Sequence, residues 1–226
     1  MSNFTTWRSL VDGEEILAIP DSAIAQFLPS NYDTGQDAWP DEIGGVGDLT
    51  EGTGITAVLT DEQNGEDLLD FDDDRVEASN VAESINQPYT AIFGAEVTDN
   101  NDSSTVIDSV STDDDRTLFQ LRYNDNDYRV QSDSAVSIGS EPTSDFAIFS
   151  VHFEGPDTEV RVNGISEGTA DAGTSGIESF RIGQDAAEGN PAMMRMGELM
   201  VYEGLSDDDR DSEEQRLADK YGVALA

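Results

Sequence analysis

The sequence has no cysteine, one histidine (His152) and one lysine (Lys220) among its 226 residues. Without cysteine it cannot form disulfide bonds, a thiolate nucleophile or a sulfur-ligated zinc site. A lone histidine excludes metal sites that need several imidazoles, and it leaves His152 as the one candidate imidazole base. No run approaches the ~18 apolar residues of a membrane-spanning helix, so we expect no insertion into a membrane.

Basic residues are scarce as well. The chain has 11 Lys and Arg against 49 Asp and Glu, a formal net charge of −38. Such a charge repels itself at ordinary ionic strength but is largely screened in molar salt, where the Debye length falls to about 3 Å. We therefore expect a high-salt environment, in an extreme halophile or a virus that infects one. Nucleic acid is not an expected partner, because so few basic side chains cannot neutralise the charge of its phosphates.

Short apolar or alternating segments, separated by Gly, Asn, Asp, Ser and Pro, predict an all-β antiparallel sandwich or barrel. These segments and nine Phe argue against an acidic disordered chain. Within 145–153, Phe149, Val151 and Phe153 share one face of the expected strand. The expected strands are 55–59, 68–71, 89–97, 105–110, 117–123, 128–131, 145–153, 159–163, 179–183 and 193–202.

One helix is expected at the C-terminal end, over 206–221. Ser206 is a suitable N-cap, and the three aspartates after it favour the helix dipole. Gly222 is a natural stop, and the pair Leu217 and Tyr221 should dock the helix against the rim of the sandwich. A short helix is also expected at 21–28. This division leaves 1–20 as an N-terminal arm, a candidate docking or oligomerisation segment, and 21–226 as the main domain.

Several motifs occur in a fixed order along the chain. They are Ala38-Trp39-Pro40-Asp41, Asn64-Gly65, Phe71-Asp72, Val160-Arg161-Val162-Asn163-Gly164, Phe180-Arg181-Ile182-Gly183, Met196-Gly197-Glu198-Leu199-Met200-Val201-Tyr202, and Leu205-Ser206-Asp207 leading to Lys220-Tyr221-Gly222. Together they resemble LamG-like, concanavalin A-type domains. The resemblance implies a two-sheet antiparallel jelly-roll sandwich (concanavalin A-like) with one C-terminal α-helix. It also implies ligand binding at the rim loops or the concave face. Trp39 is interpreted as a core residue, since its indole needs a pocket.

The resembling family includes glucanases with a Glu-x-Asp-x-x-Glu strand, in which two carboxylates serve as nucleophile and acid. No glutamate here is followed two residues later by aspartate. The nearest imitation, Glu154, Asp157 and Glu159, has the wrong spacing. No Gly-x-Ser-x-Gly elbow accompanies His152, which we interpret as a packed strand residue. We therefore expect no catalytic residues and no enzyme.

Calcium is the one cofactor that the resemblance suggests, because such sandwiches often bind it through oxygen atoms of their loops. The candidate metal ligands are Asp99, Asn101, Asp102, Asp113 and Asp115. The candidate ligand-binding residues lie in an expected hairpin turn: Tyr123, Asn124, Asp125, Asn126, Asp127 and Tyr128. In so acidic a chain carboxylate clusters also arise by chance, and scattered tyrosines usually serve packing.

These features favour a non-catalytic structural or adhesive virion protein (turret, decoration, tail fibre or spike) of a virus that infects an extreme halophile. The first 20 residues lack the pattern of a secretory signal, which virion proteins do not need because they assemble in the host cytoplasm. We expect a homo-oligomer on the virion surface, contacting other virion proteins through the arm and binding a host surface glycan or glycoprotein. The alternatives are a cell-encoded calcium-dependent carbohydrate-binding module and a glycoside hydrolase with unconventional acids such as Glu154 and Glu198.

Overall fold

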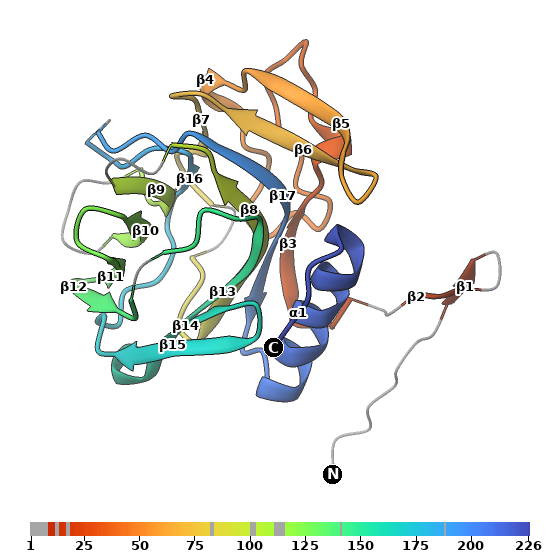
Figure 1. Cartoon of the computed structure of the whole chain (residues 1–226). Coiled ribbons are helices and arrows are strands. Elements are labelled where there is room, and N and C mark those ends of the chain that lie inside the picture. Colours follow the sequence, from red (N-terminus) through yellow and green to blue (C-terminus); the bar gives the residue numbers. More distant parts are fainter. Residues whose placement is uncertain are drawn as a thin grey trace.

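The computed structural model describes residues 9–11, 14–16, 19–81, 84–99, 103–110, 116–140, 142–187 and 189–226. In this part of the chain, two antiparallel sheets pack face to face and one helix lies outside them (Figure 1). The predicted two-sheet jelly-roll sandwich with one C-terminal helix is therefore confirmed.

The first sheet has seven strands in the order β12, β11, β10, β9, β16, β7, β4. Their bounds are β4 (Glu51–Gly54), β7 (Arg75–Ala78), β9 (Ser103–Asp108), β10 (Thr117–Arg122), β11 (Asp127–Ser132), β12 (Ser134–Ile138) and β16 (Phe180–Ile182).

The second sheet has eight strands in the order β15, β14, β13, β8, β17, β6, β5, with β3 also paired to β17. Their bounds are β3 (Ala23–Phe27), β5 (Ala57–Gln63), β6 (Glu66–Phe71), β8 (Tyr89–Val97), β13 (Ala147–Phe153), β14 (Thr158–Val162), β15 (Ile165–Ala170) and β17 (Met194–Glu203). The short strands β1 (Ser9–Val11) and β2 (Glu14–Ile16) pair with each other, and two 3-10 turns are η1 (Pro29–Asn31) and η2 (Gly155–Asp157).

The main core lies between the two sheets and follows the predicted alternation. Phe149, Val151 and Phe153 of β13 all belong to it, whereas Ile148 packs on the opposite face of the same sheet. Trp39 is fully buried, and its indole N–H donates to the Leu28 carbonyl at 2.8 Å. The prediction that Trp39 is a core residue is therefore confirmed.

Residues 21–28 do not form the expected helix. Ala23–Phe27 is strand β3, which pairs antiparallel with the second half of β17. Ala25 and Phe27 alternate into the core, a period of two that fits a strand better than a helix. The sequence-based expectation was wrong because so short a segment carries no helical periodicity to decide between the two.

Helix α1 (Asp207–Tyr221) begins and ends where the sequence predicted. The Ser206 hydroxyl accepts a hydrogen bond from the Asp209 backbone N–H at 3.2 Å, and Gly222 ends the helix in the left-handed conformation (φ 67°). It is the one helix longer than a single turn in the described ranges, and none there is long and apolar enough to cross a membrane.

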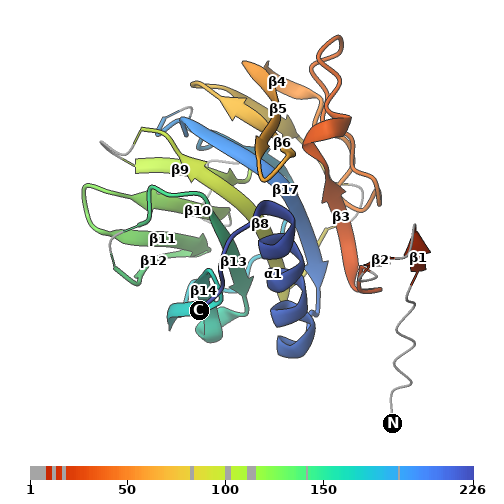
Figure 2. The ribbon, with the colours of Figure 1, turned by 45° about the vertical axis from the view of Figure 1, so that its right-hand side comes forward.

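The helix lies over the outer face of the eight-stranded sheet, in front of β8, β13 and β17, rather than at the rim (Figure 2). Leu217 and Tyr221 pack there with Ile92, Ile148 and Met200. The expected rim position was wrong because these central strands present apolar side chains on both faces. The helix therefore covers a second, smaller core.

Candidate functional site

The predicted ligand-binding turn joins β10 to β11. Asn124, Asp125 and Asn126 are exposed at its tip, and Asn126 takes left-handed backbone (φ 57°). Arg122 ties the turn together, with Nη1 2.8 Å from Asp125 Oδ2 and Nη2 donating to Asp127 Oδ2 at 2.6 Å. The two carboxylates thus stabilise the turn, and ligand binding at its tip stays a prediction.

The tyrosines that flank the turn differ in position. Tyr128 is 1% exposed, and its ring stacks on Phe119 in the core with centroids 6.0 Å apart. Its candidate role in stacking on a sugar is therefore wrong, because the ring does not face solvent. Tyr123 is half-buried and its hydroxyl donates to the Thr143 carbonyl at 2.9 Å. A sugar contact by Tyr123 stays a prediction.

Most of the candidate calcium ligands lie outside the described residues. Asn101, Asp102, Asp113 and Asp115 are outside the described residues, and Asp99 is half-buried after the end of β8. Among the described residues, no three His, Asp or Glu side chains gather in a way that could hold a metal ion. Calcium binding accordingly stays a prediction, which rests on the candidate ligands outside the described residues.

Strands β9 to β12 lie side by side in the seven-stranded sheet (Figure 2). The register of these strands brings polar residues together on the outer face of this sheet, which is turned away from the other sheet. Arg129 of β11 points to this face because the residues on either side of it belong to the core. Gln120 of β10 and Ser137 of β12 are its direct neighbours across the strands, and Gln120 in turn pairs with Thr105 of β9. We call Thr105, Gln120, Arg129 and Ser137 the polar row.

The polar row runs from a buried end to an exposed end. Thr105 and Gln120 are buried and bonded to each other, with Gln120 Nε2 donating to Thr105 Oγ1 at 2.7 Å. Arg129 is half-buried and Ser137 is exposed. The Ser137 hydroxyl accepts a hydrogen bond from Arg122 at 2.8 Å. The Arg129 guanidinium and the Ser137 hydroxyl, which lie side by side at the solvent-accessible end, are suited to hydrogen bonding with a sugar.

Beyond the row, toward β16 and β7, the same face carries ion pairs that are closed to solvent. Arg181 Nε donates to Glu77 Oε2 at 2.5 Å, and both side chains are buried. Burial raises the pKa of the Asp108 carboxyl to about 7, although Arg116, 3.5 Å away, acts in the opposite direction. Because these groups satisfy one another, they support the sheet rather than face a ligand.

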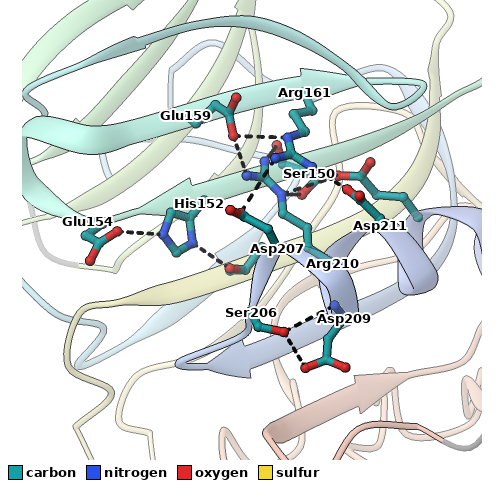
Figure 3. Close-up of polar contacts among 12 residues, drawn as sticks. Ser150, His152, Glu154, Glu159, Arg161, Ser206, Asp207, Asp209, Arg210 and Asp211 are labelled. Atoms are coloured by element: carbon teal, nitrogen blue, oxygen red, sulfur yellow. Dashed lines mark hydrogen bonds and ion pairs between the residues drawn. The ribbon is translucent and has the colours of Figure 1, made fainter. Parts of the chain in front are cut away.

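His152 lies on the outer face of the other sheet (Figure 3). Its Nε2 is 3.2 Å from Glu154 Oε2 and its Nδ1 is 2.8 Å from Thr90 Oγ1. Ser150 is fully buried, and its hydroxyl accepts a hydrogen bond from Arg210 Nε at 2.5 Å. Both ring nitrogens of His152 therefore have partners, and the Ser150 hydroxyl is bonded to Arg210 of the helix.

Glu198, one of the alternative acids, is enclosed beneath the helix at 1% exposure. Its carboxylate accepts hydrogen bonds from Gln26 at 2.8 Å, Arg216 at 2.9 Å and Lys220 at 2.9 Å. Burial alone would raise the pKa of Glu198, but Arg216 and Lys220 outweigh it and lower the pKa to about 2. The carboxylate anchors the helix, and its oxygens are occupied by protein donors.

Sequence reasoning predicted a ligand-binding turn and missed the polar row beside it. The signal was present in Tyr128-Arg129-Val130-Gln131, where polar and apolar residues alternate. That alternation predicts that Arg129 points away from the core. The residues that lie next to Arg129 come from β10 and β12, and only the register of the sheet identifies them.

No family model matches the sequence, and no curated protein matches it. Solved structures do share its fold. Domain 4 of AbnA, a GH43 extracellular arabinanase from Geobacillus stearothermophilus solved in complex with arabinotriose, has a TM-score of 0.64 at 13% identity, covering 85% of this chain and 98% of that domain. Trypanosoma rangeli sialidase has a TM-score of 0.60 at 12% identity, covering 97% of this chain and 36% of the sialidase.

The receptor binding domain of botulinum neurotoxin C/D mosaic serotype is also similar. Its TM-score is 0.59 at 12% identity, covering 86% of this chain and 51% of that one. At such identities the likeness shows a shared β-sandwich fold. The chain spans about a third of the sialidase and about half of the neurotoxin fragment.

Proposed function

We propose that this chain is a non-catalytic glycan-binding module that works in molar salt. The polar row carries the proposal, because it presents hydrogen-bonding groups on the outer face of a sheet rather than an open pair of carboxylates. The arabinanase domain with the same fold was solved with arabinotriose, which supports a sugar as ligand class. The enclosure of Glu198 supports a non-catalytic role, since the glycoside hydrolases that use a pair of carboxyl groups need both of them accessible to the sugar.

Replacement of Ser137 by Ala is expected to weaken glycan binding by about fivefold to tenfold, the effect of losing one hydrogen bond worth about 1 kcal/mol. Binding of the purified chain to a panel of neutral and acidic glycans, in about 3 M KCl to screen its charge, measures this.

Ser134→Ala is the matched control, because Ser134 is exposed on the same strand but points to the opposite face. Equal loss in both variants would argue against the row as the binding surface. A wild-type protein that binds no glycan in the panel would refute the proposed function.

We further propose that the module is displayed, in more than one copy, on the surface of a virus that infects an extreme halophile. The charge of −38 supports the high-salt setting, and several copies would raise the avidity of a weak sugar contact. Antibodies against the chain should then label purified intact particles in high salt, at vertices or tail tips, under the electron microscope. Label on cells but not on particles would favour a cell-encoded carbohydrate-binding module instead, with calcium tested by a chelator.

A further inference from the structure

Arg129 differs from the other basic residues that the structure describes. Every other described arginine, and Lys220, has a carboxylate oxygen within 3.5 Å. Among the described residues, none forms a hydrogen bond or ion pair with the Arg129 side chain. In a chain with 49 acidic residues and 11 basic ones, an unpaired arginine is the least expected arrangement.

The surroundings of Arg129 disfavour its positive charge. Burial lowers the pKa of Arg129, and the positive charges of Arg116 and Arg122 lower it further. Asp108 and Asp127, the two acids near enough to raise that pKa, are both held by other arginines. Asp108 lies 3.5 Å from Arg116, and Asp127 accepts two hydrogen bonds from Arg122, at 2.7 and 2.6 Å. Three arginines therefore gather on one stretch of the outer face, and no described acid forms an ion pair with Arg129.

Molar salt restricts what could supply that negative charge. At a Debye length of about 3 Å, attraction over a distance is screened, so a ligand must be held by direct contact. A guanidinium offers a planar fork of donors that matches two oxygens of one oxyanion, a geometry that a chloride ion cannot satisfy. The occupant is therefore expected to carry a carboxylate or a sulfate group.

The neighbours of Arg129 indicate what carries that group. Ser137, exposed on one side, provides a hydroxyl within one strand spacing, whereas Gln120 on the other side is buried and donates to Thr105. We propose that Arg129 binds the oxyanion of an acidic sugar, while the exposed Ser137 bonds a hydroxyl group of the same sugar. This inference rests on the proposed glycan-binding function and specifies its ligand class as acidic.

The test follows the Nε–Hε NMR signal of Arg129 in the full-length protein in about 3 M KCl. The signal is identified by its loss in the Arg129→Gln variant. Glucuronate supplies a carboxylate, glucose 6-sulfate supplies a sulfate ester, and glucose supplies neither. We expect one or both acidic sugars to shift the signal and to bind about tenfold or more tightly than glucose, and Arg129→Gln to abolish that preference. Which acidic sugar binds identifies the oxyanion.

Arg195→Gln is the control, because it removes the same charge from β17 of the other sheet, where Arg195 is half-buried and 3.4 Å from Glu62. It should leave binding unchanged. Arg129→Gln should also leave the melting temperature unchanged or raised, since it relieves repulsion from Arg116 and Arg122. A lower melting temperature, equal affinity for glucose, or a preference that survives Arg129→Gln would overturn the inference. If the wider panel yields only neutral glycans, this inference fails while the proposed function stands.

Discussion

Dilution from about 3 M to about 0.1 M KCl is expected to unfold the protein at room temperature or to lower its melting temperature by tens of degrees. Over this range the Debye length grows from a few ångströms to about 10 Å, so carboxylates on neighbouring turns and strands begin to repel one another. Two unit charges 10 Å apart in water interact by about 0.4 kcal/mol. A charge of −38 offers enough such pairs to exceed a typical stability of about 5–15 kcal/mol.

The structure places this repulsion on particular surfaces. Asp207, Asp208 and Asp211 are exposed on the first turns of α1, and Asp72 and Asp73 are exposed together after β6. The bases that might compensate them are mostly held in ion pairs elsewhere; Lys220, for example, bonds Glu198 beneath the helix. Surface repulsion is therefore opposed chiefly by dissolved cations.

Unfolding can be followed by the fluorescence of the fully buried Trp39 during thermal scans at several KCl concentrations. Sucrose is the control solute, because it favours the compact state without screening charge. A low concentration of MgCl2 should restore more stability than the same ionic strength of KCl. A melting temperature that is equal at both ends of the KCl range would contradict the assignment of the acidic surface to high salt.

How well the sequence predicted each strand depended on the kinds of side chains in that strand. Each of the ten expected strands overlaps an observed one, and β8 matches at both ends. The strands that were missed are β1, β2, β3, β4, β7, β12 and β15, and all of them except β3 carry Gly, Ser or charged residues. In β7 the charged Glu77 is buried, but it faces Arg181 rather than the core. Pairing across the sheet, which sequence periodicity does not report, explains why such a residue is tolerated there.

The helix shows the same limit. Leu217 and Tyr221 were predicted to face the sheet, but the buried face also includes Arg210, Glu213 and Glu214. Arg210 lies between Ser150 and Glu159, donating to them at 2.5 and 2.6 Å (Figure 3). Charged residues one helical turn apart normally indicate a solvated face. The partners of Arg210 lie 60 and 51 positions away in the sequence, so the sequence alone could not identify this buried network.

The structure explains why glycine stands at position 197, in one of the motifs on which the resemblance rests. In Met196-Gly197-Glu198, a Cβ at Gly197 would lie 2.5 Å from Cζ of Tyr221, so only glycine lets the helix approach β17 so closely. The Glu198 backbone N–H donates to the Tyr221 hydroxyl at 2.6 Å. The tyrosine and the glycine are thus one contact, formed by segments that the sequence places 24 residues apart.

Replacement of Glu198 by Gln is expected to destabilise the fold by about 3–5 kcal/mol, because it leaves the positive charges of Arg216 and Lys220 without their buried acid. In a chain of this length that loss lowers the melting temperature on the order of 10 °C. The effect should persist in molar salt, since a pair enclosed at 1% exposure is screened much less than a surface pair. Thermal unfolding of both proteins in about 3 M KCl measures the difference.

The difference should also depend on pH in a defined window. The pKa of Glu198 is lowered from 4.5 to about 2, so its contribution to stability is complete above about pH 4.5 and is lost as the pH falls toward 2. Wild type and Glu198→Gln should therefore converge in acid. Glu203→Gln, an identical change at an exposed position of the same strand, should alter the melting temperature little at any pH. Equal effects of the two substitutions would mean that the buried carboxylate does not hold the helix to the sheet.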